Sequence, residues 1–70
     1  MISFNDILGW TNFHGTTHIT AYSQDGSHRD VYDGDGEEIP NFESWGEGYM
    51  SHVYYDSIND CIQIDVEEEE

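Results

Sequence analysis

The chain of 70 residues is long enough for one small domain, and 16 aspartates and glutamates against a single arginine give it a formal net charge of −15 at pH 7. This charge excludes direct binding to nucleic acid through the protein's own basic side chains. The single cysteine excludes a disulfide within the chain, and no apolar run approaches the roughly 20 residues that span a bilayer.

The composition also bears on order and compartment. Aromatic residues make up 14% of the chain, whereas disordered acidic segments are poor in them. We therefore expect a single folded domain over residues 1–66, followed by an acidic tail over residues 67–70 that frays in solvent. The start of the chain lacks the basic and apolar regions of a secretory signal, and the lone Cys61 fits a reducing compartment, so we expect a cytoplasmic protein.

The first predicted element is a short helix over residues 3–8. Ser3 is a suitable N-cap, and Asp6 lies near the positive end of the helix dipole. Gly9 is expected to end the helix, and residues 10–16 are expected to form a loop.

Residues 17–22 are rich in β-branched and aromatic side chains, which predicts a strand. The Asp25-Gly26 pair that follows is typical of a hairpin turn, and residues 28–32 form the expected return strand. Two Asp-Gly pairs over residues 33–36 are interpreted as a second turn.

Residues 37–48 show no clear periodicity. Ile39-Pro40 indicates extended backbone, and Asn41 is expected to cap one helical turn over residues 42–44.

A second hairpin is predicted from residues 49–55, a turn over residues 56–60 and a strand over residues 61–66. The last strand alternates strictly, which places one set of side chains toward the core and the other outward. The predicted core set is Ile62, Ile64 and Val66, and the predicted outward set is Cys61, Gln63 and Asp65.

Together these elements predict an α+β fold, with a short N-terminal helix and a small antiparallel sheet of about four strands in two hairpins. We expect the helix, Trp10 and Phe42 to cover one face of the sheet.

The acidic excess is the main functional signal. Solubility is served by a net charge of magnitude about 2–8 in a small domain, so a solvated surface alone does not account for −15. A compact chain of this length is roughly 28 Å across, and duplex DNA carries about 16 charges over that length. The charge therefore favours a protein that enters a basic groove in the way nucleic acid does.

Aromatic side chains accompany the carboxylates in the second half of the chain, and tyrosine and tryptophan are favoured at the centre of interfaces. Tyr54 and Tyr55 are adjacent in a predicted strand, so at least one of them is expected to be exposed. The predicted contact surface consists of Asp30, Asp33, Asp35, Glu37, Glu38, Glu43, Trp45, Glu47, Tyr55 and Asp56. Arg29, the only base, is expected to pair with neighbouring carboxylates.

Metal binding and catalysis are the alternatives. His14 and His18 have an H-x3-H spacing, which brings two ligands to one face only in a helix, and this stretch reads as a loop that leads into a strand. Cys61 with a histidine is a formal catalytic dyad, but carboxylates raise the pKa of a neighbouring thiol. We therefore expect no metal, no cofactor and no enzymatic activity.

The pattern of the chain resembles the small acidic proteins of bacteriophages and mobile elements, which include DNA mimics and anti-CRISPR proteins. The segments that carry this resemblance are Phe4–Leu8, Asp25-Gly26, Asp33–Pro40 and Ile62–Glu67. The resemblance concerns size and charge style, so it assigns no site residue.

This resemblance implies an inhibitor of a nucleic-acid-binding bacterial enzyme, such as a Cas9-like CRISPR nuclease, that occupies its DNA- or PAM-binding groove. Two alternatives stay open. One is a small acidic interaction module that binds a basic partner without nucleic-acid competition, and the other is a metal-supported structural domain.

Overall fold

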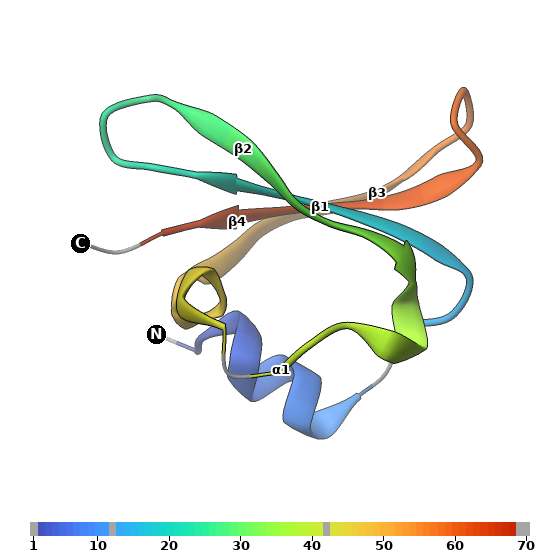
Figure 1. The fold of residues 1–70 in the computed structure, drawn as a ribbon, viewed down its shortest axis with the longest axis horizontal. Coiled ribbons are helices and arrows are strands. Elements are labelled where there is room, and N and C mark those ends of the chain that lie inside the picture. Colours follow the sequence, from blue (N-terminus) through green and yellow to red (C-terminus); the bar gives the residue numbers. More distant parts are fainter. Residues whose placement is uncertain (1, 12, 42, 69–70) are drawn as a thin grey trace.

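The computed structural model describes residues 2–11, 13–41 and 43–68. In these residues a short α-helix is followed by four strands and two single-turn 3₁₀ helices (Figure 1). The elements are α1 (Phe4–Trp10), β1 (Thr16–Tyr22), β2 (His28–Asp35), η1 (Gly36–Glu38), η2 (Ser44–Glu47), β3 (Tyr49–Asp56) and β4 (Cys61–Glu67).

Helix α1 begins with the cap that the sequence predicts. The Ser3 hydroxyl accepts a hydrogen bond from the Asp6 backbone N–H at 3.1 Å, and the Asp6 carboxylate accepts one from the Ser3 N–H. This reciprocal capping box satisfies two backbone donors that a helix start would otherwise leave unpaired. The helix continues through Gly9 to Trp10, so the prediction that Gly9 ends it is wrong by one residue.

The four strands form one sheet in the order β2-β1-β4-β3. The predicted α+β class and both hairpins are confirmed, with β1 antiparallel to β2 and β3 antiparallel to β4. The sheet is mixed, because the two hairpins join through a parallel β1–β4 pair at its centre. The connection through η1 and η2 crosses one face of the sheet before β3 begins, and this crossover makes β4 run in the same direction as β1 (Figure 1).

Strand β2 extends through residues 33–35, where the sequence predicts a turn. Gly34 lies under the Tyr32 side chain, where a Cβ atom would meet the hydroxyl oxygen at 3.3 Å, and that hydroxyl donates to the Asp35 carbonyl at 2.6 Å. The small residue thus serves close packing within the strand, and the chain turns only at η1.

The core lies between the sheet and α1, on the side called here the inner face (Figure 1). Ile19, Ile64 and Val66 come from the two central strands, while Phe4 and Trp45 pack over them with ring centroids 5.6 Å apart. Trp45 therefore fills the place predicted for Trp10, which is 71% exposed. Phe42, the other predicted covering residue, lies outside the described residues.

The connecting segment also differs from its prediction. Its helical turn is η2, which begins after Glu43 rather than after Asn41. Asn5 of α1 donates from Nδ2 to the Glu43 carbonyl and to Glu47 Oε1, both at 3.2 Å, and these bonds fix η2 against the helix.

The predicted acidic tail is partly structured. Glu67 is the last residue of β4, and the Glu68 N–H donates to the Tyr22 carbonyl at 2.8 Å. Arg29 pairs with Glu68 at this end of the sheet, with an Nη1–Oε1 distance of 2.6 Å. None of the helices described is long and apolar enough to cross a membrane.

Candidate partner-binding surface

The carboxylates that create the net charge lie at the surface. Of the 14 aspartates and glutamates among the described residues, ten are exposed, four are half-buried and none is buried. The only arginine of the chain pairs with Glu68, which confirms the expectation for Arg29, and the chain has no lysine. The surface potential is therefore set by carboxylates.

Five carboxylates gather along one border of the sheet, which we call the acidic edge: Asp30, Asp33, Asp35, Glu37 and Glu38. The first three belong to β2, which is an outermost strand, and the other two belong to η1, which follows it directly. All five are exposed. The sequence-predicted surface therefore includes one continuous group of charges.

A β-bulge brings the strand carboxylates of the acidic edge to the same face. Ile19 pairs with Tyr32, and the next residue, Thr20, pairs with Asp30, so Val31 is the extra residue. Val31 and Tyr32 both pack against the core, and the bulge lets Asp30 share the outer face with Asp33 despite their odd spacing. Strict alternation would have turned Asp30 toward the core.

Two histidines and a helix cap hold parts of the acidic edge in place. His14 Nδ1 lies 2.7 Å from Glu37 Oε1, and His18 Nε2 lies 3.1 Å from Asp30 Oδ1. The Asp35 carboxylate accepts the Glu37 N–H at 2.9 Å, which caps η1. The edge therefore has a defined geometry.

The outer face of the sheet is polar and hydrogen-bonded. Gln63 lies on this face, as predicted, but it is buried because its neighbours cover it. Its Nε2 donates to Thr20 Oγ1 at 3.0 Å and to Asp65 Oδ1 at 3.1 Å, while its Oε1 lies 2.6 Å from His18 Nδ1. Because the Asp65 carboxylate only accepts hydrogen bonds, the Gln63 amide nitrogen donates to it, and His18 Nδ1 donates to the amide oxygen Oε1.

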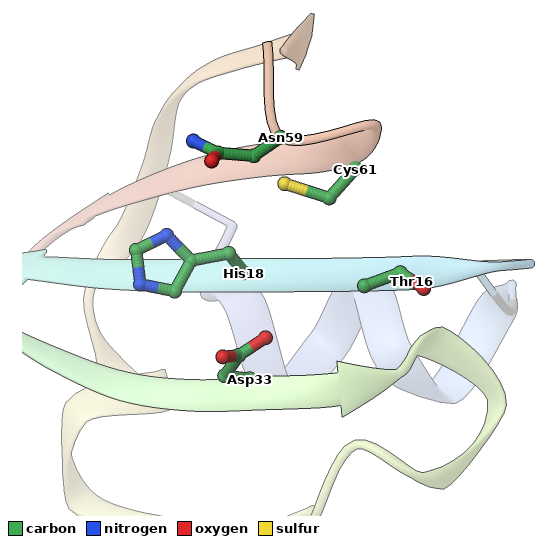
Figure 2. Close-up of a pocket in the computed structure, with 5 residues that line it drawn as sticks. All are labelled: Thr16, His18, Asp33, Asn59 and Cys61. Carbon is green, nitrogen blue, oxygen red and sulfur yellow. The ribbon is translucent and has the colours of Figure 1, made fainter. Parts of the chain in front are cut away.

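A shallow hollow of about 340 Å³ opens on the same face, lined by Thr16, His18, Asp33, Asn59 and Cys61. Figure 2 looks onto this face with α1 behind the sheet, and it shows Cys61 and Asp33 on opposite sides of β1. Burial, followed by the charges of Asp56, Asp33 and Asp60, raises the pKa of the Cys61 thiol. The thiol is therefore protonated at neutral pH, which is the form that does not attack electrophiles.

The negative potential of the outer face affects the pKa of Tyr22. The charge of Asp65, followed by burial, raises the pKa of the Tyr22 phenol above its usual value. Ionised Tyr22 would add one more negative charge to a region that already repels it.

The remaining predicted contact residues are scattered. Glu43 and Glu47 lie at η2, on the helix side of the molecule, while Tyr55 and Asp56 lie at the end of β3. Trp45 packs in the core and is only 7% exposed, so it offers little surface to a partner. Val53 is 50% exposed beside Tyr54 and Tyr55, and no sequence pattern singled it out as a contact residue.

The histidines do not converge on a common centre. His14 contacts Glu37, His18 contacts Gln63 and Asp30, and His52 lies 3.9 Å from Asp65. Across residues 2–11, 13–41 and 43–68, no group of three or more His, Cys, Asp or Glu side chains is placed to hold a metal ion. The metal-supported alternative thus has no ligand set in this part of the chain.

Comparisons of the chain with protein-family models, with curated proteins and with solved structures found no match.

Proposed function

We propose that this protein inhibits a nucleic-acid-binding bacterial enzyme by occupying its basic groove as a DNA mimic. The observation that carries the proposal is the surface position of every described carboxylate, combined with the pairing of the one arginine. The net charge of −15 is distributed over a body whose longest extent is 31 Å. A duplex of that length carries about 18 phosphate charges, so the two charge densities are similar.

A basic groove would attract such a body on the terms that apply to nucleic acid. Positive channels raise the encounter rate of acidic ligands, and salt weakens this attraction because ions screen exposed charges. The acidic edge suits the contact itself, since arginine forms bidentate pairs with carboxylates as well as with phosphates. Its carboxylates are exposed and held by β2 and η1.

The finer proposal is an anti-CRISPR protein that acts in the bacterial cytoplasm on a Cas9-like nuclease. It rests on the class resemblance of the sequence and on the chemistry of the target, which reads its PAM through arginines and holds nucleic acid in a positive channel. In this proposal the acidic edge takes the place of the PAM-proximal duplex, and no catalytic step by the inhibitor is needed.

A displacement assay tests the proposal. A guide-loaded Cas9-like nuclease binds a fluorescent PAM-containing duplex, and the acidic protein is added at about 50 mM and about 200 mM salt. We expect loss of duplex binding at the lower salt and a weaker effect at the higher salt.

Two other outcomes contradict this proposal. If the duplex stays bound while the acidic protein joins the complex, the protein is an interaction module that does not compete with nucleic acid. If the acidic protein does not bind the nuclease at all, the Cas9-like target is wrong.

A further inference from the structure

The second outer strand, β3, differs from the acidic edge in its charge and in the kind of side chain that it exposes. Residues 49–55 contain no aspartate or glutamate, and the side chains of Val53, Tyr54 and Tyr55 are 50%, 54% and 61% exposed. We call these three residues the aromatic edge. Proteins usually protect an outer strand with charges, proline or a covering segment, because its backbone N–H and C=O groups are available to another strand.

The pairing of β3 with β4 assigns each side chain of β3 to a face. Val53 and Tyr55 lie opposite Ile64 and Ile62 and share the inner face with them. His52, Tyr54 and Asp56 lie opposite Asp65, Gln63 and Cys61 and share the outer face. The irregularity of β3 falls between Met50 and His52, so residues 52–56 form a regular ladder.

Residues 52–56 are complementary to themselves when two copies run antiparallel about a twofold axis at Tyr54. In that register Tyr54 lies opposite Tyr54 of the second copy, and Val53 lies opposite Tyr55 twice. Aromatic and β-branched pairs of this kind stabilise a sheet. The remaining pair places His52 opposite Asp56, again twice, which matches a hydrogen-bond donor with a carboxylate.

The side chains in that outer-face pair are suitably placed. His52 is 73% exposed, and its Nδ1 is directed toward Asp65 at 3.9 Å, so the Nε2 edge remains for a second copy. The Asp56 carboxylate accepts from the Ile58 N–H at 3.0 Å and from Asn59 Nδ2 at 2.8 Å. These bonds fix the carboxylate at the end of the strand, and its second lone pairs can still accept.

We propose that β3 is a self-association strand, which pairs antiparallel with β3 of a second copy and joins two sheets into one. A single pair of edge strands gives a small interface, so the dimer is weak and forms only at high protein concentration. The net charge of −15 on each copy opposes association, and salt therefore favours it by screening the repulsion. This sign is opposite to that expected for binding to a basic groove.

Sedimentation equilibrium of the whole chain tests the proposal. From ~10 µM to ~1 mM protein in ~0.5 M salt, the average mass should rise from 8.1 kDa toward twice that value, and the rise should be smaller at ~20 mM salt. A mass that stays at 8.1 kDa over the whole range overturns the proposal.

Substitutions at the twofold axis test the register. Tyr54→Glu and Tyr54→Lys each place two like charges directly opposite one another, so both should weaken the dimer at least tenfold. Tyr54→Lys is the sharper variant, because it lowers the net negative charge and would strengthen association if only overall repulsion mattered. Trp10→Lys is the matched control, since Trp10 is an exposed aromatic residue on α1. Association of Tyr54→Lys that equals that of the control overturns the register.

A covalent readout covers the case in which a charged variant fails to fold. Opposed residues of an antiparallel pair have Cα atoms about 4.5–5.5 Å apart, a distance that a disulfide can bridge. Tyr54→Cys should therefore form a disulfide-linked dimer under mild oxidation much faster than Gln24→Cys, which lies in the distant β1–β2 turn. Equal rates would overturn the proposal. None of these readouts involves a nuclease, so the outcome is independent of the proposed inhibitory function.

Discussion

The two outer strands of the sheet each have an unpaired backbone edge, and they carry very different side chains along it. Strand β2 carries three exposed aspartates, which repel a second copy and remain attractive to a basic partner. Strand β3 carries exposed aromatic and aliphatic side chains and no carboxylate until its last residue. The acidic excess is therefore distributed unevenly between the two edges, and each edge suits a different kind of contact.

Loss of the core would remove both edges together. Phe4 is fully buried and packs against Phe13 and Trp45. Phe4→Ala should cost about 3–5 kcal/mol of unfolding free energy, which is comparable with the whole stability of so small a domain. Circular dichroism with urea should show an unfolded or barely folded chain at 25 °C.

The control Trp10→Ala removes an exposed side chain and should change the free energy of unfolding by no more than about 0.5 kcal/mol. A Phe4→Ala variant as stable as this control would contradict the described core.

The start of β3 depends on a glycine. A Cβ atom at Gly48 would lie 1.9 Å from the Glu67 carbonyl oxygen, which belongs to the backbone and cannot move aside cheaply. Gly48→Ala should therefore destabilise the protein by about 1–3 kcal/mol and loosen the aromatic edge first.

Gly9→Ala is the matched control, because Gly9 lies within α1 with nothing within 4 Å of the added atom. It should stabilise the helix by about 0.5–1 kcal/mol. Urea unfolding of both variants decides, and equal stabilities would contradict the packing described at Gly48.

The role of the acidic edge is tested by removing two charges without disturbing the cap of η1. Asp33→Asn with Glu38→Gln leaves the Asp35 cap in place and should weaken binding to the proposed basic partner about tenfold. Asp6→Asn with Asp60→Asn removes the same charge elsewhere and should weaken it no more than about twofold. Asparagine is suited to position 60, where φ is +52°. Affinity is measured by fluorescence anisotropy. Equal losses of affinity for the two double variants would mean that only net charge matters and that the acidic edge has no special role.

The smallest expected effect concerns the turn after β3. Hydrogen bonds from the Asn59 side chain and from backbone N–H groups lower the pKa of Asp56 below its usual value. A carboxyl with a lowered pKa stabilises the fold above its unfolded-state pKa of about 3.9, and this contribution is lost as the pH falls through the folded-state pKa. NMR titration of the Asp56 carboxyl should give a midpoint below that of a model peptide. A midpoint at or above the peptide value would contradict the described turn.

Local patterns in the sequence predicted the hairpins because strict alternation and Asp-Gly turns are short-range signals. The alternation of residues 61–66 correctly placed Ile62, Ile64 and Val66 toward the core. The parallel contact between β1 and β4 was missed because it depends on the side of the sheet on which η1 and η2 lie. Trp10 and Trp45 exchanged their expected places for the same reason, since only the tertiary arrangement decides which aromatic side chain reaches the core.

The candidate surface was predicted in part. The carboxylates of the acidic edge were identified from the charge pattern. The strand carboxylates share the outer face only because of a bulge at Val31, and no local sequence pattern predicts that bulge. The two Asp-Gly pairs at residues 33–36 are typical of turns, and only the packing of Tyr32 over Gly34 keeps the strand extended there.

The salt dependence of duplex displacement is the decisive measurement for the proposed imitation of nucleic acid. Displacement of a PAM-containing duplex from a guide-loaded Cas9-like nuclease would be measured with the wild-type protein and with the Asp33→Asn, Glu38→Gln variant over about 50–200 mM salt. We expect the wild-type affinity to fall steeply with salt and the affinity of the variant to fall less steeply, because fewer charge pairs form. A wild-type affinity that does not change with salt, or a duplex that is never displaced, would contradict a protein that imitates nucleic acid through its acidic surface.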